Sequence, residues 1–192
     1  AIVYINSYYY AEIYTAKKLL ELNEAYIEND YDYKNIIEQT EIRHNITLEE
    51  KQKKAVESAL KKGVMVITGG PGTGKTTIIN TIISIMEEEG NEVVLAAPTG
   101  RAAKRMSEAT GHDAQTIHRL LGITYINDDA RKQVFDKDED NPIEADIIII
   151  DESSMVDILL MSSLLKAVSI GTRLILVGDV DQLPSVGARN VL

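Results

Sequence analysis

A glycine-rich loop between two apolar segments constrains this sequence most. Residues 69–76 read GGPGTGKT, which fits the phosphate-binding pattern G-x-x-x-x-G-K-[ST]. The loop follows a short apolar, β-branched run, Val64–Thr68, and precedes an apolar run with helical spacing over residues 77–86. In a strand, loop and helix arrangement, backbone N–H groups and the positive end of the helix can together hold a phosphate. The sequence therefore predicts a binding site for a nucleoside triphosphate.

The loop and the first helical turn behind it contain the predicted phosphate contacts. Lys75 is expected to reach the β- and γ-phosphates, and Thr76 is expected to place its hydroxyl on Mg²⁺. The nucleotide-binding residues predicted from this motif are Gly70, Pro71, Gly72, Thr73, Gly74, Lys75, Thr76 and Thr77.

Apolar and helical segments alternate along most of the chain. We expect strands at Val64–Thr68, Glu92–Ala97, Asp146–Ile150 and Arg173–Val177. We expect helices at Leu48–Lys62, Thr76–Glu89, Arg101–Ala109, Thr116–Leu121 and Val156–Val168. The run of isoleucines at 147–150 has no polar alternation, which is typical of a strand covered on both faces. The pattern predicts an α/β fold with a mainly parallel, doubly wound sheet and its ligand at the carboxyl ends of the strands.

The first 45 residues differ from the rest, because they hold all but one of the nine tyrosines. Helical periodicity over Ala11–Tyr26 predicts a small helical segment ahead of a main domain at 46–192. The tyrosines at 8–10 could stack on nucleobases, although packing against other parts of the protein is the preferred interpretation. A capping box at 47–50, with Thr47 as cap and Glu50 reaching back, predicts that the next helix begins at Leu48.

The segment 122–144 interrupts the alternation. Ile123–Ile126 and Lys132–Phe135 could pair as a β-hairpin across residues 127–130, and a disordered acidic loop is the alternative.

The net charge of −10 argues against nucleic acid as a partner. The acidic residues are clustered, however, and the stretch 99–119 is locally basic through Arg101, Lys104, Arg105 and Arg119. A local basic face can contact phosphates on an acidic protein, with modest and salt-sensitive affinity.

Cysteine is absent, which excludes disulfides and thiolate metal sites and fits a reducing compartment. No apolar run approaches the roughly 20 residues of a membrane span. We therefore expect a cytoplasmic protein with no membrane partner. Because the chain opens at Ala1 without an initiating Met, we also expect it to be a piece of something longer.

Polar residues follow two of the expected strands directly. Asp151 fits a carboxylate for Mg²⁺, and Glu152 fits the group that positions and polarises an attacking water. A helix start is the alternative for this acidic pair. Gln182 follows the last expected strand and could sense the γ-phosphate, with a simple polar turn as the alternative. The predicted catalytic residues are Lys75, Asp151, Glu152 and Gln182, with Thr76 and Asp151 as metal ligands.

Several segments together resemble, in order, motifs I, Ia, Ib, II and III of superfamily 1 helicases. They are 69–76, APTGRAA at 97–103, TIHRLL at 116–121, DESSM at 151–155 and GDVDQLPSVGA at 178–188. The similarity is closest to the RecD-like branch, the exodeoxyribonuclease V alpha-subunit type. It covers roughly 46–192, and its PTGRAA and TIHRLL strings are more specific than the phosphate loop.

This resemblance implies a RecA-like fold that uses ATP with Mg²⁺ and moves 5′→3′ on single-stranded DNA while unwinding duplex ends. Gln52 matches the adenine-reading glutamine of the family. On its own it would be weak evidence for adenine binding, because a helical glutamine is usually solvated. The predicted DNA-binding residues are Pro98, Thr99, Arg101, Lys104, His118 and Arg119. The hairpin falls where the family carries its 1B insertion, a strand-separating pin in related enzymes. Arg189 replaces an expected glycine.

The resemblance also implies partners outside these 192 residues. A second RecA-like domain, carrying motifs IV to VI, would supply arginines for phosphoryl transfer, and subunits of a nuclease complex are further candidates. A nucleotide-dependent DNA-binding switch without productive unwinding is the main alternative, and a phosphate-transferring kinase is a weaker one.

Overall fold

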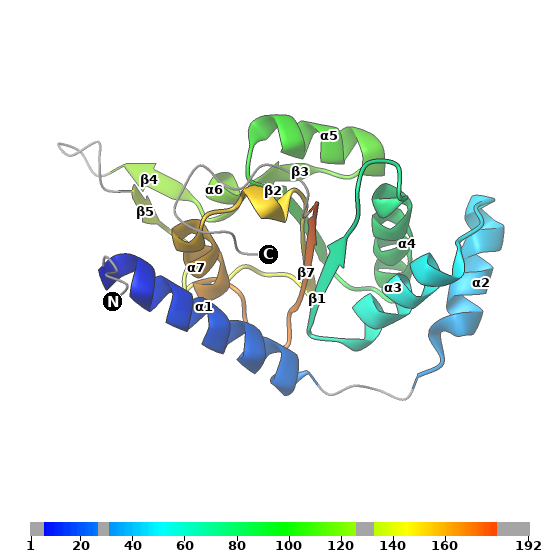
Figure 1. Cartoon of the computed structure of the whole chain (residues 1–192), viewed down its shortest axis with the longest axis horizontal. Helices are drawn as coiled ribbons and strands as arrows, with labels where there is room; N and C mark the ends of the chain where they lie inside the picture. Colours follow the sequence, from blue (N-terminus) through cyan, green and yellow to red (C-terminus); the bar gives the residue numbers. More distant parts are fainter. Residues whose placement is uncertain (1–5, 27–30, 126–132, 180–192) are drawn as a thin grey trace.

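The core of the molecule is a five-stranded parallel sheet in the order β1-β7-β6-β2-β3 (Figure 1). The computed structural model describes residues 6–26, 31–125 and 133–179. The strands are β1 (Val64–Thr68), β2 (Val93–Ala97), β3 (Ala114–Thr116), β6 (Ile147–Ile150) and β7 (Arg173–Gly178). This confirms the predicted α/β class and the four expected strands. The short β3 was missed, because Ala-Gln-Thr offers no apolar run.

Helices cover both faces of the sheet. One apolar core lies under α3 (Glu50–Lys61) and α4 (Lys75–Glu88), and the other lies under α7 (Ile158–Lys166). Along β6, Ile147 and Ile149 belong to the first core, whereas Ile148 and Ile150 belong to the second. Successive strand side chains point to opposite faces, so the unbroken isoleucine run is explained by burial on both sides.

The predicted N-cap and start of α3 are wrong by two residues. Glu49, not Thr47, is the N-cap of α3, and the Gln52 side chain accepts a hydrogen bond from the Glu49 N–H at 2.9 Å. Leu48 is held outside the helix because its side chain is buried and its N–H donates to Glu41 at 2.7 Å. Tertiary contacts therefore override the local capping signal.

The helix expected at Val156–Val168 is also shorter than predicted. A 3-10 turn, η1 (Ser153–Met155), follows β6, and α7 begins only at Ile158. Asp157 causes this start, because its carboxylate accepts from the N–H groups of Leu159 and Leu160 at 2.9 Å. An acidic side chain in this position satisfies helix N–H groups that otherwise lack partners.

The first part of the chain forms two helices that lie on different sides of the molecule (Figure 1). The first, α1 (Asn6–Ala25), packs against α7, and the second, α2 (Tyr33–His44), packs against α3 and α4. Tyr33 is buried in the core beneath α2. Tyr26 accepts hydrogen bonds from the Arg173 guanidinium, whereas Tyr9 and Tyr10 are largely exposed.

The predicted hairpin is confirmed. Strands β4 (Ile123–Tyr125) and β5 (Gln133–Phe135) pair antiparallel, with Ile123 opposite Phe135. The residues between them, 126–132, lie outside the described part of the chain. The hairpin follows the single turn α6 (Ile117–Leu120), and α5 (Gly100–Thr110) follows β2. Within the described ranges, no helix has the length and apolarity that a bilayer span requires.

Candidate functional site

The loop between β1 and α4 has the backbone conformation of a phosphate cradle. Gly72 and Gly74 have φ angles of +77° and +81°, in the left-handed region, and Gly74 caps α4. The positive φ of Gly74 requires glycine, and a Cβ there would also displace the Gln52 amide nitrogen. The Thr73 hydroxyl donates to the Gly70 carbonyl at 2.9 Å and closes the loop. The loop thus precedes the N-terminus of a 14-residue helix, where an anion is favoured.

Lys75 points back into this loop. Its ammonium donates to the carbonyl oxygens of Gly69 and, at 3.1 Å, of Gly70. The amine therefore lies inside the curve of the loop, where the oxygens of a bound triphosphate would compete with these carbonyls. This is the placement expected for a lysine that contacts the β- and γ-phosphates.

Asp151 and Glu152 lie at the carboxyl end of β6, close to the loop. The Asp151 carboxylate accepts from the N–H of Glu152 at 2.8 Å, and Glu152 has a left-handed φ of +54°. Burial raises the pKa of Asp151, while the Glu152 N–H and the charges of Lys75 and Arg105 oppose that rise. The positive charge of Lys75 is thus close enough to act on Asp151.

A cavity of about 470 Å³ brings the predicted metal ligands and catalytic acids together. Its lining includes Thr76 from α4, Asp151 and Glu152 from the end of β6, and Arg105 from α5. Hydroxyl and carboxylate oxygens are the ligands that Mg²⁺ prefers, and Mg²⁺ is usually held by few protein groups together with substrate phosphates. The described residues contain no cluster of three or more acidic or histidine side chains that would form a cage. Thr76 and Asp151 therefore fit a magnesium ion shared with a triphosphate.

Arg105 is the functional candidate that the prediction left out of the site. Its guanidinium lies 3.8 Å from the Glu152 carboxylate. The signal available was the spacing of Arg101 and Arg105, four residues apart on one helix, which places them on the same side of α5. Only the tertiary structure shows that this side reaches Glu152.

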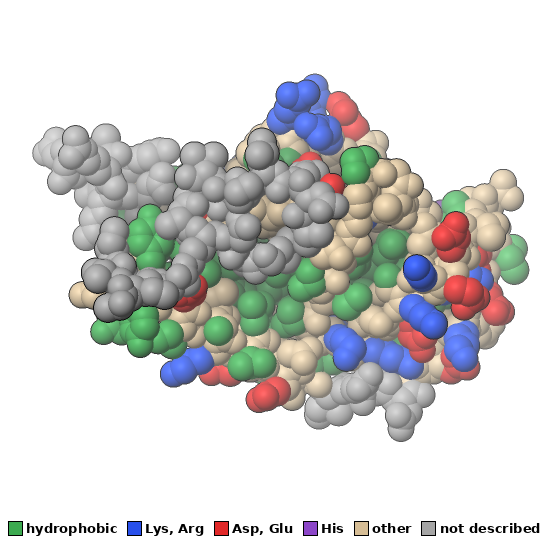
Figure 2. Space-filling model, viewed as in Figure 1, with side chains coloured by type: hydrophobic (Ala, Val, Ile, Leu, Met, Phe, Trp, Pro, Cys, Tyr) green, Lys and Arg blue, Asp and Glu red, His purple; other side chains and the backbone are tan. Residues whose placement is uncertain are grey.

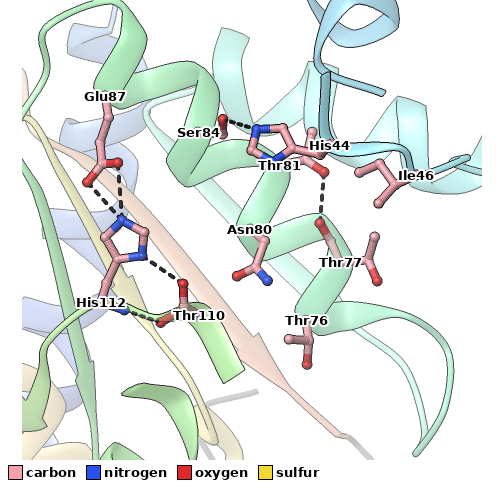
Figure 3. A pocket seen from close by; sticks show the side chains of 10 residues that line it. All are labelled: His44, Ile46, Thr76, Thr77, Asn80, Thr81, Ser84, Glu87, Thr110 and His112. Carbon is pink, nitrogen blue, oxygen red and sulfur yellow. Dashed lines mark hydrogen bonds and ion pairs between the residues drawn. The ribbon is translucent and has the colours of Figure 1, made fainter. Parts of the chain in front are cut away.

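A second cavity, of about 400 Å³, runs along the polar side of α4 and shares Thr76 with the first (Figure 3). Thr77 and Asn80 line it from α4, while His44 and His112 line it from α2 and from the loop after α5. His44 is hydrogen bonded to Ser84, and His112 lies 3.1 Å from Glu87. Sequence reasoning missed this cavity, because its walls come from three separate helices.

Gln52, the predicted adenine-reading residue, is bound at both ends of its amide. Its oxygen accepts from the Glu49 N–H, and its nitrogen donates to the Thr73 carbonyl at 3.2 Å. Gln52 therefore connects α3 directly to the phosphate loop.

The predicted DNA-binding residues lie at the ends of two neighbouring strands. Thr99 caps α5 just after β2, accepting from the Ala102 N–H at 3.2 Å, and Thr116, the last residue of β3, caps α6. Ala97 and Thr116 are register partners in the sheet, so the two segments are adjacent. Figure 2 shows Lys and Arg side chains gathered over α5, which carries Arg101, Lys104 and Arg105.

The remaining predicted DNA contacts vary in exposure. Arg101 and Arg119 are exposed, and Pro98 is half-buried. His118 is also half-buried, with its ring centroid 6.0 Å from that of Phe135 on the hairpin. Gln182 and Arg189 lie outside the described residues.

Comparison with known proteins gives consistent matches. Residues 52–188 match the AAA domain family. The chain is 45% identical over 141 residues to the ATP-dependent RecD2 DNA helicase of Deinococcus radiodurans, covering 73% of this chain and 19% of that protein. It is 42% identical to the RecBCD enzyme subunit RecD of Mycobacterium tuberculosis, covering 74% of this chain and 28% of the relative.

Among solved structures, the Pif1 helicase from Candida albicans superimposes with a TM-score of 0.51 at 27% identity, over 74% of this chain and 34% of that one. The chain thus spans only about a fifth to a third of the length of these proteins.

Proposed function

This chain belongs to the AAA domain family, in its RecD-like superfamily 1 helicase branch, and on that premise we propose that it is the first motor domain of an ATP-dependent DNA helicase. One observation carries the proposal. Thr76, Asp151 and Glu152 line one cavity directly beside the phosphate loop. That cavity lies at the same edge of the sheet as the caps of α5 and α6, Thr99 and Thr116. A nucleotide site and a basic surface for DNA therefore share the carboxyl ends of the strands.

The residues have distinct roles in the proposed reaction. The loop N–H groups and Lys75 bind the triphosphate, and Thr76 and Asp151 would hold Mg²⁺, which neutralises charge on the phosphate oxygens when bound. Glu152 orients a water for attack on the γ-phosphorus and accepts its proton. Gln182 is proposed as the γ-phosphate sensor and Gln52 as the group that reads adenine.

The basic side chains of α5 and α6 are proposed to hold single-stranded DNA. Arg101 and Lys104 on α5, with His118 and Arg119 on α6, would contact its phosphates, and Thr99 would orient the first of these helices. In this proposal residues 1–45 are a helical segment ahead of the ATPase domain at 46–192, the hairpin is a 1B-like insertion, and movement is 5′→3′. A second RecA-like domain, and nuclease-complex subunits such as those in the name of the RecBCD relatives, are the proposed partners.

Stimulation of ATP hydrolysis by DNA tests this function. In the whole protein that carries this chain, single-stranded DNA is expected to accelerate hydrolysis, and Glu152→Gln is expected to abolish hydrolysis while keeping nucleotide binding. A nucleotide-dependent switch would bind ATP without that stimulation. Hydrolysis that DNA leaves unchanged would therefore reject the motor in favour of the switch.

A further inference from the structure

A buried glutamate on α2, Glu41, contacts three groups around the start of α3. Glu41 has a side chain that is only 11% exposed. One of its carboxylate oxygens accepts from the Leu48 N–H at 2.7 Å, and the other lies 2.8 Å from the Lys53 ammonium. Its backbone carbonyl accepts from the Ile46 N–H at 3.0 Å. Glu41 thereby binds both the loop that leads into α3 and the first turn of that helix.

These contacts are expected to stabilise the fold more than an exposed ion pair does. A carboxylate that leaves water is costly unless it is paired and hydrogen bonded, and Glu41 meets both conditions. The hydrogen bond from Lys53 holds the pKa of Glu41 below its ordinary value, so the carboxylate is ionised at neutral pH. Removing it would leave the buried Leu48 N–H without its acceptor.

The start of α3 in turn holds the phosphate loop. Gln52, the neighbour of Lys53, accepts from the Glu49 N–H and donates to the Thr73 carbonyl. Its amide nitrogen lies against Gly74, where a Cβ would displace it. Any shift of the first turn of α3 would therefore move the Gln52 side chain, which connects this helix to the loop at Thr73.

We propose that Glu41 is a positioning residue for nucleotide binding, which fixes the first turn of α3 and through it the contact of Gln52 with the phosphate loop. The proposal rests on the proposed function in that the loop binds a nucleotide. It assigns a role to α2, which lies ahead of the part of the chain that matches the AAA domain family at 52–188.

A double-mutant cycle tests whether Glu41 acts through Gln52. The affinity of the 192-residue chain for a fluorescent ATP analogue with Mg²⁺ is measured for Glu41→Ala, Gln52→Ala and the double variant. Losing a hydrogen bond of about 1 kcal/mol weakens binding about five- to tenfold. We expect each single variant to lose about this much, and the double variant to lose no more than Gln52→Ala alone.

Losses that add in the double variant, or a folded Glu41→Ala chain with unchanged affinity, would overturn the proposal. Glu57→Ala removes the partner of Lys61 on the same helix and is the matched control, expected to keep wild-type affinity. If Glu41→Ala does not fold, Glu41→Gln replaces it in the cycle, because it keeps an oxygen for the Leu48 N–H and loses the charge that faces Lys53.

Two further measurements separate the possible causes of a loss. Hydrogen exchange at the Leu48 N–H reports its hydrogen bond to Glu41 directly. The exchange is expected to accelerate in Glu41→Ala and not in Gln52→Ala. Equal exchange in the two variants contradicts the proposal. A wild-type chain that binds no nucleotide would reject the proposed function itself, and this inference with it.

Discussion

Arg105 lies beside Glu152, with 3.8 Å between the guanidinium and the carboxylate. This contact joins α5, which carries basic residues on the proposed DNA surface, to the acid that follows β6. The Arg105 side chain is 61% exposed, so the pair is expected to contribute little to stability. Its main effect is electrostatic, because Arg105 also favours the ionised form of Asp151.

Arg105→Met is therefore expected to shift the pH dependence of nucleotide binding. With the positive charge removed, the pKa of Asp151 rises further, and Mg²⁺-dependent binding of an ATP analogue declines at a higher pH than in the wild-type protein. Binding titrations across the acidic range measure the shift. Lys61→Met removes a charge of the same sign from α3 and is expected to leave the profile unchanged. Superimposable profiles for Arg105→Met and wild type would contradict the prediction.

Asp151→Asn is expected to increase stability while it abolishes function. Burial raises the pKa of Asp151 in the folded protein, so its contribution to stability is fully present below the pKa of the unfolded chain and is lost as the pH rises through the folded pKa. Asparagine is neutral at every pH. The variant should have a higher Tm than the wild type at neutral pH and no Mg²⁺-dependent nucleotide binding. A lower Tm, or Mg²⁺-dependent binding that persists, counts against this assignment.

Gly74→Ala tests the contact between the phosphate loop and α3. Gly74 and Gly90 both have φ angles of +81°, but a Cβ meets the Gln52 amide at Gly74 and nothing within 4 Å at Gly90. Gly90→Ala is expected to lower the free energy of unfolding by about 1–2 kcal/mol, because alanine is strained in the left-handed conformation. Gly74→Ala should cost more and should also abolish nucleotide binding. Equal losses of unfolding free energy in the two variants would contradict the prediction.

Ile149→Ala tests the burial of β6 on the face that α3 and α4 cover. Ile149 is fully buried, and truncating such a side chain leaves a cavity that costs about 2–5 kcal/mol. Ile42→Ala on α2, where the side chain is 81% exposed, is expected to change stability by less than about 0.5 kcal/mol. Chemical denaturation of both variants gives the comparison, and a small loss at Ile149 would refute the packing on that face.

The 192-residue chain on its own is expected to bind ATP but to hydrolyse it slowly and not to unwind DNA. In the superfamily 1 helicases that the sequence resembles, the arginine that stabilises phosphoryl transfer lies on a second motor domain. Such arginines accelerate turnover by a factor of about 10³–10⁵. Lys75→Ala should abolish the binding. A fluorescent forked duplex provides the unwinding assay, and strand separation by the wild-type chain would reject the prediction.

Much of the fold was predictable because its signals are local. The run Ile147–Ile150 and the loop 69–76 each specify their own structure through side-chain type and glycine content. The start of α3 was not predictable in this way, because Leu48 is held by Glu41, seven residues earlier in the chain, and the helix begins only after it. The short strand β3 owes its place to pairing with β2 rather than to its own sequence.

In the candidate site, too, the residues with local sequence signals were predictable and the contacts made by tertiary packing were not. The positions of Lys75, Asp151 and Glu152 follow from motifs at strand ends, since parallel strands end at one edge of the sheet. The contact of Arg105 with Glu152, and the cavity between His44 and His112, depend on how helices pack across the sheet. No spacing within the sequence indicates those distances.

The two N-terminal helices have a consequence for where the folding unit begins. The match to the AAA domain family starts at residue 52, yet Leu22 of α1 is buried in one core and Ile37 of α2 in the other. A chain cut at the boundary of that similarity would lose covering side chains from both layers at once. The matched domain is therefore shorter than the packed unit, and a version of this domain that keeps both cores must start upstream of residue 52.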